Sequence, residues 1–281
     1  MAQAQVLGPV TTTVIEPSHG WRALDLRELW RFRELVYFLA LRDVKVRYKQ
    51  TAIGVAWVVL QPVLAMAIFS VVFGGIAKLP SDGVPYPLFV FAGLIPWLYF
   101  ANATNNASVS IVGNAQLVSK VYFPRLAIPV AAVLANLVDL AIGLGLVVVL
   151  LGVVGVLPGS QIALLPVLVL ALVVAAMGVS VWLSALDVQY RDIRYAVPFL
   201  IQVWFFATPV VYSAAQVSEP WRTLLALNPM LSLIEAFRWI LLGSIPPSPQ
   251  SLLVSGVVIA MLLGTGLLYF RRMERSFADV I

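Results

Sequence analysis

The stretch LAIPVAAVLANLVDLAIGLGLVVVLLGV, residues 126–153, decides the class of fold. It contains a single charged residue, Asp139, and an α-helix needs only about 20 apolar residues to cross a hydrocarbon core of ~30 Å. One intramembrane carboxylate costs about 2.5 to 3.5 kcal/mol, which about twenty Leu, Val and Ala neighbours at up to about −0.5 kcal/mol each outweigh. The stretch therefore predicts a membrane-spanning helix.

The composition extends this interpretation to the whole chain. Hydrophobic residues make up 61% of the 281 residues and charged residues only 11%, against about 25% charged residues in soluble proteins. So few charges cannot cover the surface of a soluble protein of this size. Because there is no cysteine, disulfides, thiolate metal sites and cysteine nucleophiles are excluded. We expect an all-α integral membrane protein with no metal site and no nucleic-acid partner.

Six stretches are long enough to span the membrane: 52–77, 87–112, 126–153, 162–186, 195–214 and 251–270. Fifteen of the 18 basic residues precede the first stretch, follow the last, or lie in the second and fourth connections. The positive-inside rule places these segments in the cytoplasm. The sequence therefore predicts six transmembrane helices with both termini cytoplasmic.

The N-terminal region divides into two parts. We expect residues 1–20 to form a loose tail and residues 21–50 an amphipathic interface helix, which ends in the basic run Arg42, Lys45, Arg47 and Lys49. A membrane anchor and a mechanical element are both compatible with this pattern. Residues 51–281 are then a single transmembrane domain.

The connection 215–250, here called the external element, is too apolar for an ordinary loop. It contains apolar pieces at 221–227 and 230–242, broken at Asn228-Pro229 and each too short to span. This pattern predicts a re-entrant or interfacial helix pair before the last span, on the outer face. Glu235 and Arg238, three residues apart, could pair. A packed cap and a gate both fit.

Several predicted spans contain polar, aromatic or small residues that are better placed against other helices or water than against lipid. The second span is rich in aromatic and amide residues between Trp97 and Ser110, which suits a sugar path but also an interface belt with helix contacts. The fifth span is aromatic and contains Pro198 and Pro209. In the sixth, a ridge of small residues at 256, 260 and 264 would let helices approach closely, either within the bundle or between subunits. For Asp139, a proton relay and a carboxyl group hydrogen-bonded within the bundle are the two interpretations, and no second intramembrane acid or base is apparent.

The motifs of common enzyme classes are absent. There is no Walker A loop, no H-E-x-x-H and no G-x-S-x-G sequence. Asp187 and Asp192 could hold a metal ion in a transferase, but Arg191 and Arg194 beside them favour a salt-bridged docking turn. We therefore expect no catalytic residue in this chain.

Four motifs together resemble a known family. They are PLFVFAGLIPW (87–97), LVSKVYFPR (117–125), DVQYRDIR (187–194), and Asn228-Pro229 followed by EAFR (235–238). The chain is similar, from about residue 22 onward, to the permease subunits of ABC transporters that export O-antigen, teichoic acid or capsule polysaccharide.

The resemblance implies partners, a cofactor and site residues. It implies a second copy of the chain, two ATPase subunits that bind ATP and Mg²⁺, an undecaprenyl-linked glycan and the lipid of a bacterial inner membrane. The implied substrate path comprises Trp57, Trp97, Tyr99, Phe100, Asn102, Asn106, Phe199, Trp204, Phe206 and Tyr212. The implied coupling surface comprises Leu117, Lys120, Tyr122, Arg125, Asp187, Tyr190, Arg191 and Asp192. The implied external gate comprises Trp221, Asn228, Pro229, Glu235 and Arg238.

Two other function classes stay open at this point. A membrane-embedded glycosyltransferase or phosphotransferase would depend on Asp187 and Asp192. A proton-coupled carrier would depend on Asp139 and would work without ATP.

Overall fold

The computed structural model describes residues 26–49, 54–156, 158–218, 221 and 225–277, and every element within these ranges is helical. The α-helices are α1 (Leu26–Arg31), α2 (Arg33–Lys49), α3 (Gly54–Phe69), α4 (Tyr86–Ser108), α5 (Ser110–Gly113), α6 (Ala115–Lys120), α7 (Ala127–Ala135), α8 (Leu137–Val154), α9 (Leu165–Gln189), α10 (Ile193–Phe206), α12 (Pro229–Leu242) and α13 (Pro249–Glu274). A π-helix η2 (Ser70–Ile76) and the 3₁₀ segments η3 (Ser160–Leu164) and η4 (Ala214–Gln216) complete the elements. The expected tail 1–20 lies outside the described residues.

Five helical segments are long and apolar enough to cross a membrane. They are Ala56–Ile76, Tyr86–Ser108, Ala127–Val154, Ser160–Gln189 and Pro249–Glu274. The all-α membrane fold is thus confirmed, and these segments correspond to five of the six predicted spans.

The predicted fifth span, 195–214, differs from the other five. Its regular part is α10, which has 14 residues and ends at Phe206. At 1.5 Å per residue this helix is about 21 Å long, shorter than the ~30 Å hydrocarbon core. The chain then turns through Thr208 and Pro209 instead of continuing as a helix. Six spans, and a re-entrant pair after the fifth, remain predictions.

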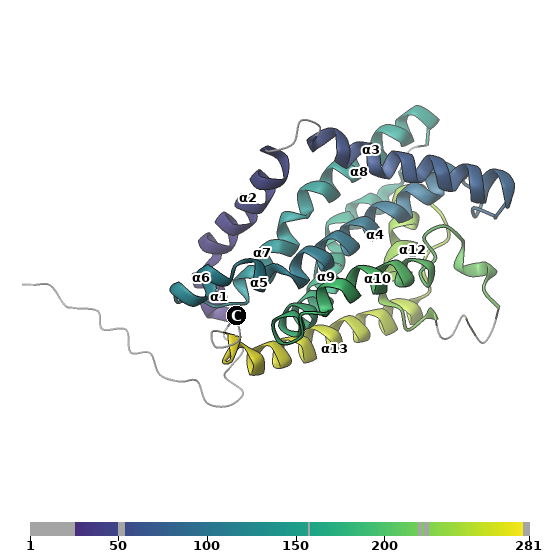
Figure 1. Cartoon of the computed structure of the whole chain (residues 1–281). Coiled ribbons are helices and arrows are strands. Elements are labelled where there is room, and N and C mark those ends of the chain that lie inside the picture. The colour runs from purple at the N-terminus through teal and green to yellow at the C-terminus, as the bar shows by residue number, and fades with distance from the viewer. Residues whose placement is uncertain (1–25, 50–53, 157, 219–220, 222–224, 278–281) are drawn as a thin grey trace, which may run out of the picture.

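Helix α4 is the centre of the bundle. In its most apolar window 83% of the residues are buried inside the protein, against 6 to 28% in the other four long segments. It packs against α3, α7, α8, α9, α10 and α12, and Figure 1 shows it running through the middle of the elongated molecule. The other long helices therefore turn much of their apolar surface outward, toward lipid or another subunit.

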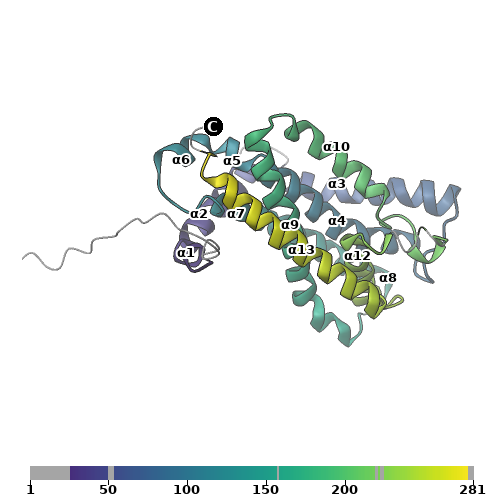
Figure 2. The same ribbon diagram turned by 90° about the horizontal axis from the view of Figure 1, so that it is seen from below.

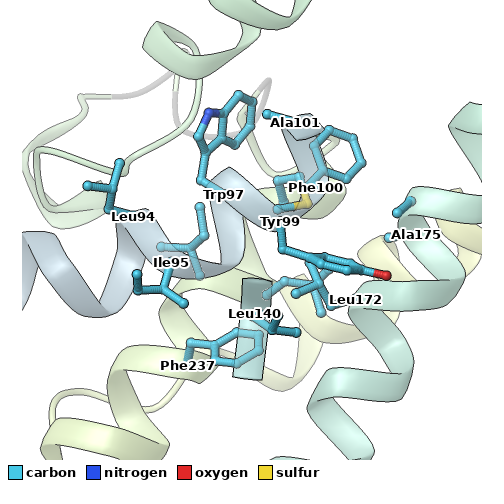
Figure 3. Close-up of a cluster of buried hydrophobic side chains, with 14 of the residues drawn as sticks. Leu94, Ile95, Trp97, Tyr99, Phe100, Ala101, Leu140, Leu172, Ala175 and Phe237 are labelled. Atoms are coloured by element: carbon cyan, nitrogen blue, oxygen red, sulfur yellow. The ribbon is translucent and has the colours of Figure 1, made fainter. Parts of the chain in front are cut away.

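The buried side chains form two clusters. The larger surrounds α4 and includes the residues of Figure 3, with Leu140, Leu172 and Phe237 contributed by α8, α9 and α12. The smaller joins α2, α7 and the C-terminal end of α13, with Val118 and Val188 at its edge. Figures 1 and 2 both place α1, α2, α6 and the end of α13 at one end of the molecule. Most of the segments predicted to be cytoplasmic therefore gather together.

Helices α9 and α13 approach closely, at glycines other than those expected. A Cβ atom on Gly266 would lie 2.7 Å from Cδ1 of Trp182 and 3.1 Å from the carbonyl oxygen of Gly178. In contrast, a Cβ atom on Gly256 or Gly264 would meet nothing within 4 Å. The ridge at 256, 260 and 264 thus faces away from the described part of the chain, because the bundle uses another face of α13.

This contact predicts different outcomes for two glycine substitutions on the same helix. Gly266→Ala should destabilise the protein by about 1 to 3 kcal/mol, because the methyl group overpacks the α9–α13 contact. Gly264→Ala is the matched control and should leave stability unchanged. The measurement is the midpoint temperature of unfolding in detergent. Equal midpoints for the two variants would show that the close approach is wrong.

Candidate functional site

A cavity of about 450 Å³ opens between the end of α2 and helices α3, α4 and α8. Four residues of the expected substrate path line it: Trp57, Tyr99, Asn102 and Asn106. The other lining residues are Arg47, Val58, Gln61, Pro62, Ile95, Leu98, Asn136, Asp139, Leu140 and Gly143. Polar side chains and aromatic rings are therefore brought together within membrane helices.

An ion pair lies at one end of this cavity. Nη1 of Arg47, near the C-terminal end of α2, is 2.5 Å from Oδ2 of Asp139, in the first turn of α8. The Tyr48 hydroxyl donates to the other carboxylate oxygen. Burial, followed by the hydrogen bond and charge of Asp139, raises the pKa of Tyr48 above its ordinary value, so the phenol remains a donor.

Two asparagines extend the ion pair into a network. Oδ1 of Asn136 accepts hydrogen bonds from Nη1 of Arg47 and from Nδ2 of Asn106, both at 3.1 Å. Asn136 is completely buried at the junction of α7 and α8. The network therefore connects the interface helix to α4 and α8. The partner of Asp139 is thus Arg47, which lies on α2 and outside the long apolar segments.

Three other residues of the expected path form a packed aromatic group. Trp97 and Phe100 are almost completely buried, and Figure 3 shows the Trp97 and Tyr99 rings pointing in different directions from α4. The ring of Phe100 packs edge-on against Trp204 with centroids 5.1 Å apart, and Trp97 lies 5.6 Å from Phe205. Within this chain these rings join α4 to α10 and do not line the cavity.

The remaining residues of the expected path are on the outer surface of α10 and the turn after it. Phe199 and Phe206 are 65% and 61% exposed. The Tyr212 hydroxyl donates to the carbonyl oxygen of Phe206 at 3.2 Å. The expected path residues therefore occupy three places: the cavity, the α4–α10 core and the exposed face of α10.

The first expected coupling segment is α6 and the turn after it. Leu117 packs against the smaller core cluster, whereas Lys120 and Tyr122 are exposed. Arg125 is tied to the last helix: its backbone N–H donates to Oε1 of Glu274 at 3.1 Å, and its guanidinium donates to the Glu274 carbonyl oxygen. The turn thus exposes the side chains of Lys120 and Tyr122, while Arg125 holds it against α13.

The second expected coupling segment is the turn between α9 and α10. Asp187 is fully buried, and one of its oxygens lies 3.6 Å from Nε of Arg194. Tyr190, Arg191 and Asp192 are exposed. The ion pair joins the two ends of the turn, and the three exposed side chains lie on its surface, where another protein could contact them.

The external element is fixed by its break, Asn228-Pro229. Oδ1 of Asn228 accepts from the backbone N–H of Met230, which caps α12, and from the indole N–H of Trp204, both at 3.0 Å. Its Nδ2 donates to Oγ1 of Thr208 at 2.8 Å. Pro229 occupies the first turn of α12, where it lacks no hydrogen bond. Trp221 is exposed.

Arg238 is buried, and its guanidinium is hydrogen-bonded to backbone carbonyl groups. Its guanidinium donates to the carbonyl oxygens of Phe89, Pro209 and Val210, at 3.1, 2.8 and 2.5 Å. The guanidinium carbon also lies 3.6 Å from the centroid of the Phe89 ring. One side chain thereby joins α12 to α4 and to the turn that follows α10.

The sequence profile of the family described as "ABC-2 type transporter" matches residues 34–242. The chain belongs to this family. Among the curated relatives, the "O-antigen export system permease protein RfbA" of Myxococcus xanthus is 32% identical over 259 residues, 91% of this chain and 98% of the relative. A protein of the same name from Klebsiella pneumoniae is 28% identical, covering 88% of this chain and 95% of its own. The "Polysialic acid transport protein KpsM" of Escherichia coli is 21% identical, covering 85% and 93%.

These relatives confirm the resemblance drawn from the four motifs. They are named as permeases and transport proteins, not as enzymes, and this chain is a multi-pass membrane permease of the ABC-2 type.

Sequence reasoning missed three cavity residues of this ABC-2 permease. Arg47 belongs to a basic run that is compatible with a membrane anchor or a mechanical element, and Gln61 and Asn136 are single amides within apolar stretches. A polar residue inside a span was the available signal. Its partner could not be deduced, because the rotation of each helix is set by packing.

The carbonyl contacts of Arg238 predict that lysine cannot replace it. Arg238→Lys should lower the stability of this ABC-2 permease by roughly 1 to 3 kcal/mol for each buried carbonyl oxygen left without a donor. The control is Arg272→Lys on the exposed side of α13, which should leave stability unchanged. The unfolding midpoint in detergent checks both. A midpoint for Arg238→Lys that equals the control would contradict the proposed role of the three hydrogen bonds.

Proposed function

We propose that this chain is the transmembrane subunit of an ABC transporter that exports a lipid-linked polysaccharide, of the O-antigen class or similar, across the bacterial inner membrane. The observation that carries the proposal is the alignment with a relative named as an O-antigen export permease, over 98% of that relative's length. The five long apolar helices support a role within the membrane.

ATP hydrolysis belongs to a separate subunit in this proposal. These 281 residues contain no Walker A loop, so ATP and Mg²⁺ would be bound by two ATPase subunits on the cytoplasmic side, with two copies of this chain above them. The turns after α6 and α9 are suited to contact them. Val118 and Val188 belong to the same core cluster, so both turns lie at one end, where Lys120, Tyr122 and Tyr190 are exposed.

The substrate path and the gate are also part of this proposal. The outward faces of α3 and α10, including Phe199 and Phe206, would meet the second copy or the glycan. The external element would close the outer end of the path, and its anchoring by Asn228 and Arg238 supports movement as a unit with the turn after α10.

The composition of the complex tests the assignment. The permease extracted gently from native membranes should carry two ATPase subunits per two copies and should hydrolyse ATP. Lys120→Glu combined with Tyr122→Ala should lower recovery of the ATPase about tenfold, which corresponds to a loss of about 1.4 kcal/mol of binding free energy. Ile76→Ala, 76% exposed at the end of η2, is the control and should retain the ATPase. Recovery of the permease alone, without ATP turnover, would contradict the proposal.

Energy coupling distinguishes this transporter from a proton-coupled carrier. Because Asp139 is neutralised by Arg47, we expect no proton relay through it. Export of the glycan into inverted vesicles should stop without ATP and should continue when an ionophore collapses the proton gradient. Export that survives ATP depletion and fails with the ionophore would favour the carrier.

A further inference from the structure

The cavity between α3, α4 and α8 is built from residues that recur at helical spacing. Trp57 and Gln61 are one turn apart on α3, and Asn102 and Asn106 are one turn apart on α4, so each pair shares a face. Trp57 is 57% exposed, so its ring is accessible from the cavity side. An indole ring and two helix faces bearing amides therefore surround one space.

Some of these amides have unused hydrogen-bonding capacity. Asn106 is bonded to Asn136, but among the described residues the carboxamides of Gln61 and Asn102 and the indole N–H of Trp57 have no hydrogen-bond partner. An unpaired amide within a membrane span is costly unless it meets water or a polar ligand. The space is therefore suited to a group with many hydroxyls and an apolar face, because an amide can donate and accept at once and a ring can stack.

The charge of the cavity restricts that group further. Among the described residues that line it, Arg47 and Asp139 alone carry charge, and they are 2.5 Å apart. The positive charge of Arg47 and the negative charge of Asp139 cancel, so the cavity offers no net electrostatic attraction to an anion. Arg47 is further occupied by Asn136.

We propose that this cavity binds an uncharged sugar residue, with Gln61 and Asn102 as hydrogen-bonding partners, the Trp57 indole as stacking surface, and the Arg47–Asp139 pair as a neutral floor. The inference rests on the proposed function, in which the chain moves a polysaccharide. It adds a defined subsite within one copy of the chain and a preference for neutral over acidic sugars.

Saturation-transfer NMR tests the proposal on the complete permease–ATPase complex in lipid nanodiscs. The neutral probes are trisaccharides of glucose, galactose, mannose and rhamnose, and the acidic probe is a sialic acid dimer. At least one neutral probe should receive saturation, and Gln61→Ala combined with Asn102→Ala should reduce its signal about tenfold. Leu64→Ala, on the same helix and outside the cavity lining, is the control and should leave the signal unchanged.

A second variant tests the neutral floor. Asp139→Asn removes the one negative charge of the cavity lining and keeps the positive charge of Arg47, so the signal of the sialic acid dimer should rise while that of the neutral probe falls or stays level. Elution of each variant as a complex on size exclusion separates loss of binding from loss of folding.

Three results would overturn the proposal: no saturation of any neutral probe, equal saturation of the acidic probe in the wild type, or a phospholipid that is retained by the wild type and lost from Trp57→Ala. The last would assign the cavity to lipid. Export by the wild-type complex is measured separately, so failure of this inference is distinguishable from failure of the proposed function.

Discussion

The buried guanidinium of Arg238 is the interaction on which the packing of α12 against the rest of the bundle depends. Its three carbonyl acceptors belong to α4 and to the turn after α10, and its own helix is α12. A charge in such a place is tolerated only when its donors are used. Gly93 makes this possible, since a Cβ atom there would lie 2.8 Å from Nη2 of Arg238. The external element is therefore attached both to the turn after α10 and to the central helix, and a movement of the two together relative to α4 would break only the bond to Phe89.

The opposite end is held by two ion pairs and by hydrogen bonds of Arg125, and two of these three contacts join segments far apart in the sequence. Arg47 joins the interface helix to α8, Arg194 closes the turn after α9 on Asp187, and Arg125 joins the turn after α6 to α13. Each contact is at least partly buried, so it is screened less than a surface ion pair. An ATPase that pushed on these turns would therefore act on a connected frame and not on separate loops.

Prediction from the sequence succeeded for features that depend on the hydropathy of a continuous stretch. It failed for features that depend on contacts between distant residues. Five of the long apolar stretches became long helices, because hydropathy over about 20 residues is enough to identify them. The stretch at 195–214 became a shorter helix, since the carbonyl groups of Pro209 and Val210 leave the helical pattern and meet Arg238. Likewise, spacing did not decide whether the ridge at Gly264 serves the bundle or a subunit contact, and within this chain the close approach is at Gly266.

The sequence by itself therefore determined that this is an all-helical membrane protein with the motifs of an ABC-2 permease. The expected path also contained four of the fourteen residues that line the cavity, one in the first span and three in the second. Only the tertiary structure decided that Arg47 is the partner of Asp139, that Trp97 and Phe100 are core residues in this chain, and that Gln61 faces Asn102 across a cavity. The physical reason is that hydrophobicity and charge act residue by residue, whereas a contact depends on how each helix is rotated and crossed against its neighbours.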